Sequence, residues 1–342
     1  MTPRFTLPPD REATAPAEWS GRSRDEVRLM AVSPGEVRHT LFRDLPLLLR
    51  PGDLVVVNTS GTLPARLDAR RADGVVVPLH VSTELDDGGW VVEVRRPDNS
   101  GPDLGGEPGA ALGLPGGHRL TLRAGFPDPA RPGRLWRAEV TPRTPAAAFL
   151  ARHGRPVRYG YVTGDVPLQA YQNVYATELG SAEMASAGRP FSERLLVRLV
   201  ARGVVVAPLT LHTGVSSPEA HEPPAPERFA VPEVTARLVG TTRRAGGRVV
   251  AVGTTVTRAL ESATGEDGGT RPAAGWTDLV LGAERPARVV TGLVTGLHAP
   301  EASHLELLEA VAGAGLVERA YAEAVRGGYL WHEFGDAMLF LP

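Results

Sequence analysis

The chain contains no cysteine. Disulfides, thiolate nucleophiles, cysteine-ligated zinc and cysteine-ligated iron–sulfur clusters are therefore excluded, and so is the radical chemistry that starts at such clusters. Lysine is absent as well, so all 37 basic residues are arginine. Without a P-loop lysine or a Schiff-base lysine, the chain cannot be a Walker-type ATPase, a pyridoxal enzyme or a lysine aldolase.

The chain also lacks a strong net charge and any long apolar run. A net charge of −2 at pH 7 gives no general attraction to nucleic acid, although a local arginine face could still bind phosphates. No run approaches the roughly 18 apolar residues of a membrane span, and no apolar segment follows the N-terminal arginine. We therefore expect a cytoplasmic protein that does not enter a membrane.

The composition of the 342 residues, 42% hydrophobic and 22% charged, is that of a globular chain long enough for two domains. Residues 68–153 hold short alternating or β-branched runs between Gly/Pro/Asp clusters, which is typical of a small antiparallel barrel or sandwich. After about residue 155, strands alternate with helices, as in a layered α/β domain. We expect a layered α/β main domain, residues 1–67 and 154–342, interrupted by a small antiparallel β-barrel domain at residues 68–153.

Several segments predict individual elements of the main domain. A buried strand is expected at Leu54–Val57. Residues 191–203 predict a helix that stops at Gly203, with Ser192 as one candidate for its N-cap. Residues 276–282 predict a further strand.

A Gly-Thr-Thr corner, Gly253, Thr254 and Thr255, joins a predicted strand to a predicted helix. Backbone N–H groups and threonine hydroxyls converge at such a helix N-terminus and can bind a carboxylate or phosphate. A plain helix cap is the alternative, and the commoner one. One turn further, Arg258 and Glu261 share a helix face, where the alternative to ligand binding is a surface ion pair.

A long polar stretch, YQNVYATELGSAEMASAGRPFSE, precedes the predicted helix. Loops of this length usually have a function. The small residues Ser186, Ala187 and Gly188 would let the backbone approach a ligand. Alternatively, Gly188, Arg189 and Pro190 merely start the helix.

Two histidines follow predicted strands, His212 in TLHTG and His298 in TGLHAP, where α/β folds place ligands. Asp336 in FGDAMLF could serve as a general acid or base. The alternatives are structural: a satisfied lone histidine in each case, and an aspartate that accepts the hydrogen bonds of a turn. Neither histidine has the spacing of a metal site, and no metal is expected.

Nine segments, taken in order, resemble one known family. They are FRDLPLLLRPGDLVVVN, LPARL, YQNVYA, SAG, TLHTG, RVVAVGTTVTRALES, GWTDLV, HAP and FGDAMLF. From about Phe42 to Leu339 the chain is similar to the S-adenosylmethionine:tRNA ribosyltransferase-isomerases of queuosine biosynthesis. The similarity is weakest across the predicted barrel.

The resemblance implies the interrupted α/β fold and a reaction. Enzymes of this kind transfer and isomerise the ribosyl part of S-adenosylmethionine onto the aminomethyl group of a 7-deazaguanine base in a tRNA anticodon. The products are epoxyqueuosine in the tRNA, adenine and methionine. S-adenosylmethionine is then the donor substrate and tRNA the expected partner. Since the sulfonium supplies the activation, no metal or redox cofactor is required.

The resemblance also implies roles for the candidate site residues. His212 and His298 are expected to transfer protons. Asp336 is expected to orient a reacting group or to accept a proton. Residues that bind the donor or substrate are expected at Asn58, Arg66, Tyr171, Gln172, Tyr175, Ser186, Gly188, Thr254, Thr255, Arg258 and Glu261.

Several loops depart from the family pattern. The family's Asn-Asp-Thr-Arg turn is Asn58–Gly61 here, with an acid and an arginine lost, and Arg189 and Pro190 stand where leucine and histidine are usual. The family reaction on tRNA is therefore one hypothesis. A paralogue that uses the same donor on a small molecule or another non-tRNA acceptor is the second. A non-catalytic binding protein with the same fold is the third, and the retained polar loop residues argue against it.

Overall fold

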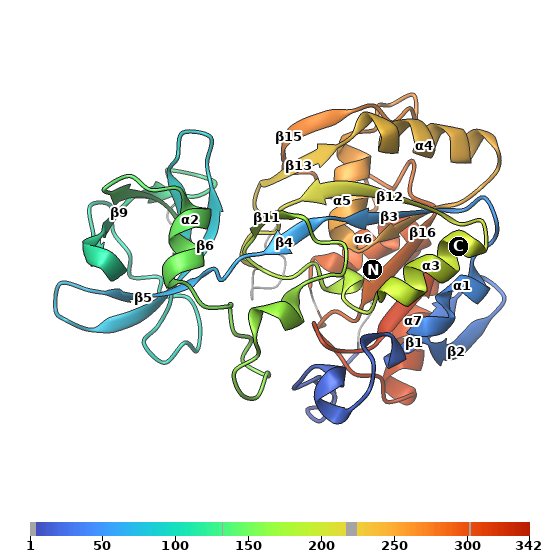
Figure 1. The fold of residues 1–342 in the computed structure, drawn as a ribbon, viewed down its shortest axis with the longest axis horizontal. Helices are drawn as coiled ribbons and strands as arrows, with labels where there is room; N and C mark the ends of the chain where they lie inside the picture. The colour runs from blue at the N-terminus through green and yellow to red at the C-terminus, as the bar shows by residue number, and fades with distance from the viewer. Residues whose placement is uncertain (1–4, 132, 217–223, 301) are drawn as a thin grey trace.

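The computed structural model describes residues 5–131, 133–216, 224–300 and 302–342. Figure 1 shows two parts along the long axis of the molecule, a closed barrel at one end and a large sheet with its helices at the other. The chain enters the barrel after the first strands of the large sheet and then returns to complete that sheet.

The large sheet has nine strands. Their order across the sheet is β15 (Ala273–Thr277), β13 (Glu227–Val231), β12 (Val205–Leu211), β3 (Leu54–Asn58), β14 (Val249–Val252), β16 (Gly292–Gly296), β17 (Ala337–Phe340), β1 (Arg28–Val32) and β2 (Val37–Leu41). The neighbours β12, β3, β14 and β16 run parallel to one another. Because β17 is antiparallel to β16, it begins at the edge where the four parallel strands end. We call this edge the carboxyl edge; in α/β sheets it is where ligands bind.

Helices cover both faces of the large sheet. The α-helices of the described residues are α1 (Leu45–Leu48), α2 (Ala146–His153), α3 (Glu193–Ala201), α4 (Glu233–Arg244), α5 (Thr254–Ser262), α6 (His304–Ala312) and α7 (Ala314–Arg326). Short 3-10 helices lie at Ala17–Ser20, Arg24–Glu26, Phe42–Asp44, Pro115–Gly117, Leu168–Tyr171 and Ser186–Gly188. None of the described helices is long and apolar enough to cross a membrane.

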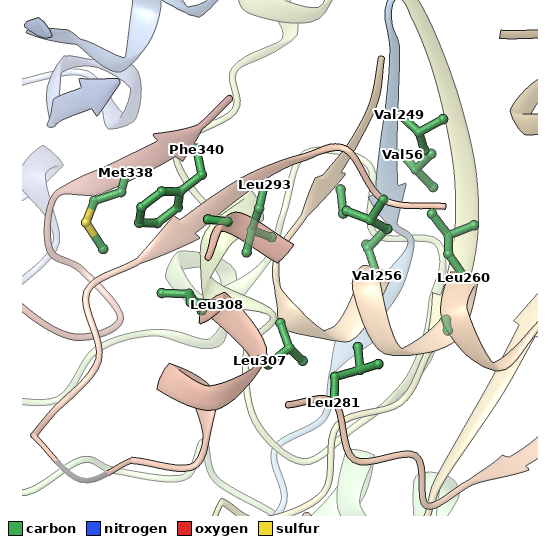
Figure 2. Packing of buried hydrophobic residues seen from close by; sticks show 14 of the residues in the cluster. Val56, Val249, Val256, Leu260, Leu281, Leu293, Leu307, Leu308, Met338 and Phe340 are labelled. Carbon is green, nitrogen blue, oxygen red and sulfur yellow. The ribbon is translucent and has the colours of Figure 1, made fainter. Parts of the chain in front are cut away.

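Coverage on both faces explains why the central strands are continuously apolar. Along β3, Leu54 and Val56 pack into one core with α4, α5, α6 and α7, whereas Val55 and Val57 pack into a second core with α1 and α3. This is the two-residue period of a strand. Figure 2 shows part of the first core, in which Val256 of α5 lies among the strand side chains.

Six strands close into an antiparallel barrel. Their order is β10 (Leu135–Thr141), β7 (Trp90–Val94), β6 (Val76–Glu84), β5 (Arg66–Arg70), β8 (Ala111–Gly113) and β9 (Arg119–Gly125). The barrel encloses a core of its own, with Trp90 and Trp136 fully buried. Helix α2 packs against it through Phe149, whose ring meets the Trp90 ring edge-on at a centroid distance of 5.6 Å.

A short parallel ladder, β4 (Ser60–Thr62) with β11 (Glu178–Ser181), lies where the chain passes from the sheet to the barrel. Gln172 extends this ladder with its side-chain amide. The amide oxygen accepts the N–H of Thr62 at 2.9 Å, and the amide nitrogen donates to the Thr62 carbonyl at 2.7 Å. The polar stretch before α3 therefore fixes the segment that connects the large sheet to the barrel.

The α/β class predicted from the sequence is confirmed. Ser192 is the N-cap of α3 and accepts a backbone N–H at 3.1 Å, and Gly203 follows the helix with a φ of 78°. The predicted strand at 276–282 is wrong from residue 278 onward. β15 ends at Thr277 because the Thr277 hydroxyl accepts the N–H of Leu279 and closes a turn.

Candidate active site

A cavity of about 120 Å³ lies at the carboxyl edge of the sheet. We call it the edge cavity. Since roughly 10–15 Å³ holds one water molecule, it has room for a group about the size of an amino acid. It is lined by Glu183, Met184, Ala185, Ser186, Ala187, Thr213, Ser216, Val252, Gly253, Thr254, Thr255, Thr295, Gly296, His298, His304 and Glu333.

A second cavity of about 200 Å³ adjoins the edge cavity and shares five lining residues with it: Thr213, Ser216, Thr254, Thr255 and His304. It is also lined by Arg258 of α5 and by Arg134, the residue before barrel strand β10. A ligand larger than an amino acid therefore has room to extend from the edge cavity towards the barrel.

Helix α5 begins at the edge cavity. Gly253 precedes it with a φ of 94°, and no side chain caps the helix. The first-turn N–H groups have no partner inside the helix and can bind an anion, with Thr254 and Thr255 lining the cavity beside them. Asn58, at the end of β3, holds this corner: its amide donates to the Leu211 carbonyl at 2.8 Å and to the Thr255 hydroxyl at 3.3 Å.

Replacing Gly253 by alanine tests this corner. At a φ of 94° an alanine is strained, and its Cβ would lie 3.2 Å from the Cβ of Ala187. We expect the free energy of unfolding to fall by about 1–3 kcal/mol. Because the start of α5 must move away from Ala187, affinity for the expected donor should fall as well. Urea unfolding measures the first effect and titration with S-adenosylmethionine the second.

Gly246→Ala is the matched control for Gly253→Ala. Gly246 also has a positive φ, 75°, but nothing lies within 4 Å of a Cβ added there. It should lose stability and keep the donor affinity of the wild type. Unchanged donor affinity in Gly253→Ala would mean that the start of α5 does not hold the donor.

His298 reaches the edge cavity from the segment after β16. Its Nε2 lies 2.9 Å from the Thr295 hydroxyl, and its ring stacks on His304 with centroids 4.6 Å apart. Burial lowers the pKa of His298 well below its usual range, and His304 and His332 lower it further. Burial also lowers the pKa of His304 to about 4. Both imidazoles are neutral at pH 7, so His298 has a lone pair with which to accept a proton.

Two glutamates of the edge cavity were not predicted from the sequence. Glu183 is 8% exposed, and its carboxylate accepts the N–H of Ser216 at 3.1 Å and its hydroxyl at 2.8 Å. Burial raises the pKa of Glu183. Glu333 has one buried carboxylate oxygen, Oε2, that finds no hydrogen-bond partner in the part of the chain that the structure describes, and burial raises the pKa of Glu333 to about 7. The edge cavity therefore contains two carboxylates as well as two histidines.

His212 lies outside the edge cavity. It lines a groove of about 340 Å³ beside the barrel, together with Leu179 and Gly180 of β11. Its Nδ1 lies 2.7 Å from the Ser60 hydroxyl. Burial lowers the pKa of His212, and Arg228 lowers it further. The two predicted proton-transfer histidines therefore face different spaces, and His298 is the one that shares a cavity with the start of α5.

The alternative interpretation of Arg258 and Glu261 as a surface ion pair is wrong. Both side chains are buried and they have different partners. Arg258 pairs with Glu227, and Glu261 lies 3.3 Å from the guanidinium of Arg285. Glu261 also accepts the backbone N–H groups of residues 288–290 at 2.9 to 3.1 Å. Arg258 lines the second cavity, whereas the carboxylate of Glu261 is engaged within the fold.

Asp336 is buried just before β17 and is not among the residues that line the edge cavity. It accepts the backbone N–H of Arg28 at 2.8 Å and pairs with the Arg28 guanidinium at 2.7 Å. It also accepts the N–H of Leu330 at 2.9 Å, while its own N–H donates to the Leu330 carbonyl. Asp336 therefore closes the turn that carries Glu333 into the edge cavity.

Within the polar stretch, Ser186 lines the edge cavity. Gly188 lies at a close approach, where an added Cβ would come 2.2 Å from the hydroxyl of Tyr175. That hydroxyl is buried and has no hydrogen-bond partner among the residues described, and burial raises the pKa of Tyr175 above its usual range. Gly188 is thus required for packing beside the cavity.

The remaining predicted residues line neither of the two adjoining cavities. Tyr171 packs on Phe334 with ring centroids 5.4 Å apart, and Gln172 holds the β4 ladder. Arg66, at the start of β5, lies 3.5 Å from the Asp68 carboxylate. All three residues lie around the segment that connects the large sheet to the barrel.

Comparison with known proteins identifies the family. Residues 2–340 match a family model described as queuosine biosynthesis protein. The chain belongs to this family. The S-adenosylmethionine:tRNA ribosyltransferase-isomerase of Synechococcus elongatus is 35% identical, over 99% of this chain and 94% of its own. The enzyme of that name from Thermus thermophilus is 36% identical, over 98% of each chain.

A solved structure shows the same likeness. The crystal structure of S-adenosylmethionine tRNA ribosyltransferase from Thermotoga maritima covers 98% of this chain and 99% of its own, with 30% identity and a TM-score of 0.54. The queuosine family suggested by the nine segments is confirmed, and the match includes the barrel, where the resemblance is weakest. Of the three hypotheses for function, these relatives support the family reaction.

Proposed function

We propose that this protein transfers and isomerises the ribosyl moiety of S-adenosylmethionine onto the 7-aminomethyl-7-deazaguanine base of a tRNA, giving epoxyqueuosine and releasing adenine and methionine. The observation that carries the proposal is the nearly full-length match to relatives named S-adenosylmethionine:tRNA ribosyltransferase-isomerase. The edge cavity supports it, because it combines the open N-terminus of a helix with a neutral histidine.

The residues of the edge cavity fit the demands of this reaction. The first-turn amides of α5, with Thr254 and Thr255, bind the methionine carboxylate. The sulfonium acidifies the neighbouring ribose carbon, which must lose a proton, and adenine must gain one or be hydrogen-bonded as it leaves. His298 is the proton-transfer group on the donor side. His212 is a second candidate, acting from the groove beside the barrel.

The residues engaged within the fold act by positioning others. Asn58 holds the start of α5, Glu261 holds the loop before β16, and Asp336 closes the turn before β17. The segments held by Asn58 and Asp336 reach the edge cavity directly, whereas the loop held by Glu261 leads into β16, whose other end lies there. These three residues are therefore positioning residues in the proposal.

We also propose that residues 68–153 form a domain inserted between residues 1–67 and 154–342. The closed barrel with its own hydrophobic core supports this division, and its strand β5 begins at Arg66, two residues before the expected boundary. A cytoplasmic location is part of the same proposal, because that is where a tRNA substrate is found.

Incubation with S-adenosylmethionine tests the function. Purified protein is mixed with the donor and with tRNA that carries the 7-aminomethyl-7-deazaguanine base, and mass spectrometry follows adenine, methionine and the modified nucleoside. We expect adenine release together with a mass gain on the base. The same tRNA with unmodified guanine is the control and should give neither. Donor binding without product on the modified tRNA would overturn the tRNA reaction in favour of a non-tRNA acceptor, and absence of donor binding would favour a non-catalytic protein.

A further inference from the structure

One of the two carboxylates in the edge cavity has an oxygen without a hydrogen-bond partner among the described residues. This oxygen is Oε2 of Glu333, and it is buried. Burying a carboxylate in this way is unfavourable, and burial accordingly raises the pKa of Glu333 to about 7. A ligand with a hydrogen-bond donor or a positive charge would supply the partner that this oxygen lacks.

The turn that carries Glu333 is held firmly. His332 has a φ of 72°, a conformation that costs free energy in a residue other than glycine. Its ring stacks on Tyr161 with centroids 4.3 Å apart, and its Nε2 lies 3.3 Å from the Glu12 carboxylate. Together with the bonds of Asp336 to Leu330, these contacts fix the backbone on both sides of Glu333.

The same cavity has the opposite polarity at the start of α5. The open N-terminus of a helix is equivalent to roughly half a positive charge. One cavity thus combines a site for an anion with a carboxylate that can bind a cation. A zwitterionic α-amino acid has this pair of charges.

We propose that the edge cavity binds the amino-acid head of the donor, with Glu333 accepting hydrogen bonds from its α-ammonium group and the N-terminus of α5 receiving its α-carboxylate. The inference rests on the proposed function, since the donor of that reaction carries a methionine head. It assigns to Glu333 a binding role that is separate from the proton transfer of His298.

The other polar side chains of the cavity are less suited to an ammonium group. Glu183 already accepts two hydrogen bonds from Ser216. His298 and His304 are neutral at pH 7, because burial lowers the pKa of both. Glu333 is therefore the carboxylate in this cavity that has an oxygen available to accept a hydrogen bond from the ammonium group.

The inference predicts that donor affinity depends on pH. An ammonium favours the ionised form of Glu333, so affinity should rise as the pH rises through about 7, the pKa of Glu333 in the free protein. Of the groups around it, His298 and His304 are already neutral there, and burial raises the pKa of Tyr159 well above its usual range. Glu183, whose pKa burial also raises, is distinguished by a Glu183→Gln variant, which should keep the rise.

Calorimetric titration of the full chain with S-adenosylmethionine, in the absence of tRNA, tests the inference. Glu333→Gln keeps the shape of the side chain but cannot ionise. We expect its donor affinity at about pH 7.5 to fall about 10- to 100-fold, and the rise with pH to disappear. A donor analogue with hydrogen in place of the α-amino group should bind the wild type and the variant equally. Glu139→Gln, at an exposed position on the barrel, should behave as the wild type.

Three results would contradict the inference in different ways. Equal affinity and an equal pH profile in Glu333→Gln would overturn it and leave the proposed function intact. Normal donor affinity with a raised KM for tRNA would assign Glu333 to the aminomethyl group of the acceptor instead, which also overturns it. A wild-type protein that binds no donor would overturn the proposed function itself. Thermal unfolding of each variant shows that the comparison is made between folded proteins.

Discussion

Replacing His298 by alanine is expected to lower the rate of adenine release about 10²- to 10⁴-fold. The imidazole lies in the edge cavity and is neutral at pH 7, because burial holds the pKa of His298 well below its usual range, and its lone pair is the group that the substitution removes. The backbone bonds of this residue to Tyr321 and Trp331 do not depend on its side chain, so the segment should keep its place. Single-turnover kinetics with saturating donor and modified tRNA separate the chemical step from binding.

His39→Ala is the matched control for His298→Ala. The His39 side chain is 46% exposed on β2, at the outer edge of the large sheet, so its removal should leave the rate unchanged. A His212→Ala variant compares the two candidates, because His212 faces the groove and not the edge cavity. If His298→Ala turned over at the wild-type rate while His212→Ala did not, the proton transfer would belong to the groove.

Part of the candidate site was predictable because its signals are local. A strand followed by Gly-Thr-Thr and a helix, or by a histidine, is visible within ten residues of sequence. Thr254, Thr255 and His298 were predicted in this way, Ser186 was predicted from the small residues of the long polar stretch, and all four line one cavity. Parallel strands lie side by side in the sheet, so segments that follow their carboxyl ends meet at one edge.

The partners of Arg258 and Glu261 were not predictable from their spacing. The rule that residues three apart pair on a helix surface assumes a face in solvent. Residues 256–261 of α5 are all buried, so each charge must find a partner from another element. Arg258 forms an ion pair with Glu227, and Glu261 forms one with Arg285. The helix pattern alone contains no information about these partners.

Glu183 and Glu333 were missed for a related reason. Glu183 precedes α3 in the sequence, whereas Glu333 follows α7. The two line one cavity because β17 runs antiparallel to β16 and therefore starts at the carboxyl edge. Asp336 was predicted as a possible acid or base, although its carboxylate pairs with Arg28 at the other end of the chain. Strand order decides both contacts, and local patterns do not determine the strand order of a mixed sheet.

Replacing Glu261 by alanine should cause the largest loss of stability, about 3 to 5 kcal/mol in the free energy of unfolding. The variant removes a fully buried carboxylate, and it leaves the Arg285 guanidinium without this partner and the N–H groups of residues 288–290 without their acceptor. Urea unfolding of the full chain measures the effect. Glu266→Ala, a few residues further in an exposed loop, is the control and should stay within about 0.5 kcal/mol of the wild type.

The same variant separates positioning from donor binding. Glu261 holds the loop that leads into β16, and β16 leads to His298, so the turnover of folded Glu261→Ala should fall while donor affinity changes little. Glu261→Gln keeps an acceptor oxygen and should recover part of both the stability and the turnover. If Glu261→Ala instead kept its stability and lost donor affinity, the carboxylate would contact the donor directly, and the donor-binding role expected from the family resemblance would replace the positioning role.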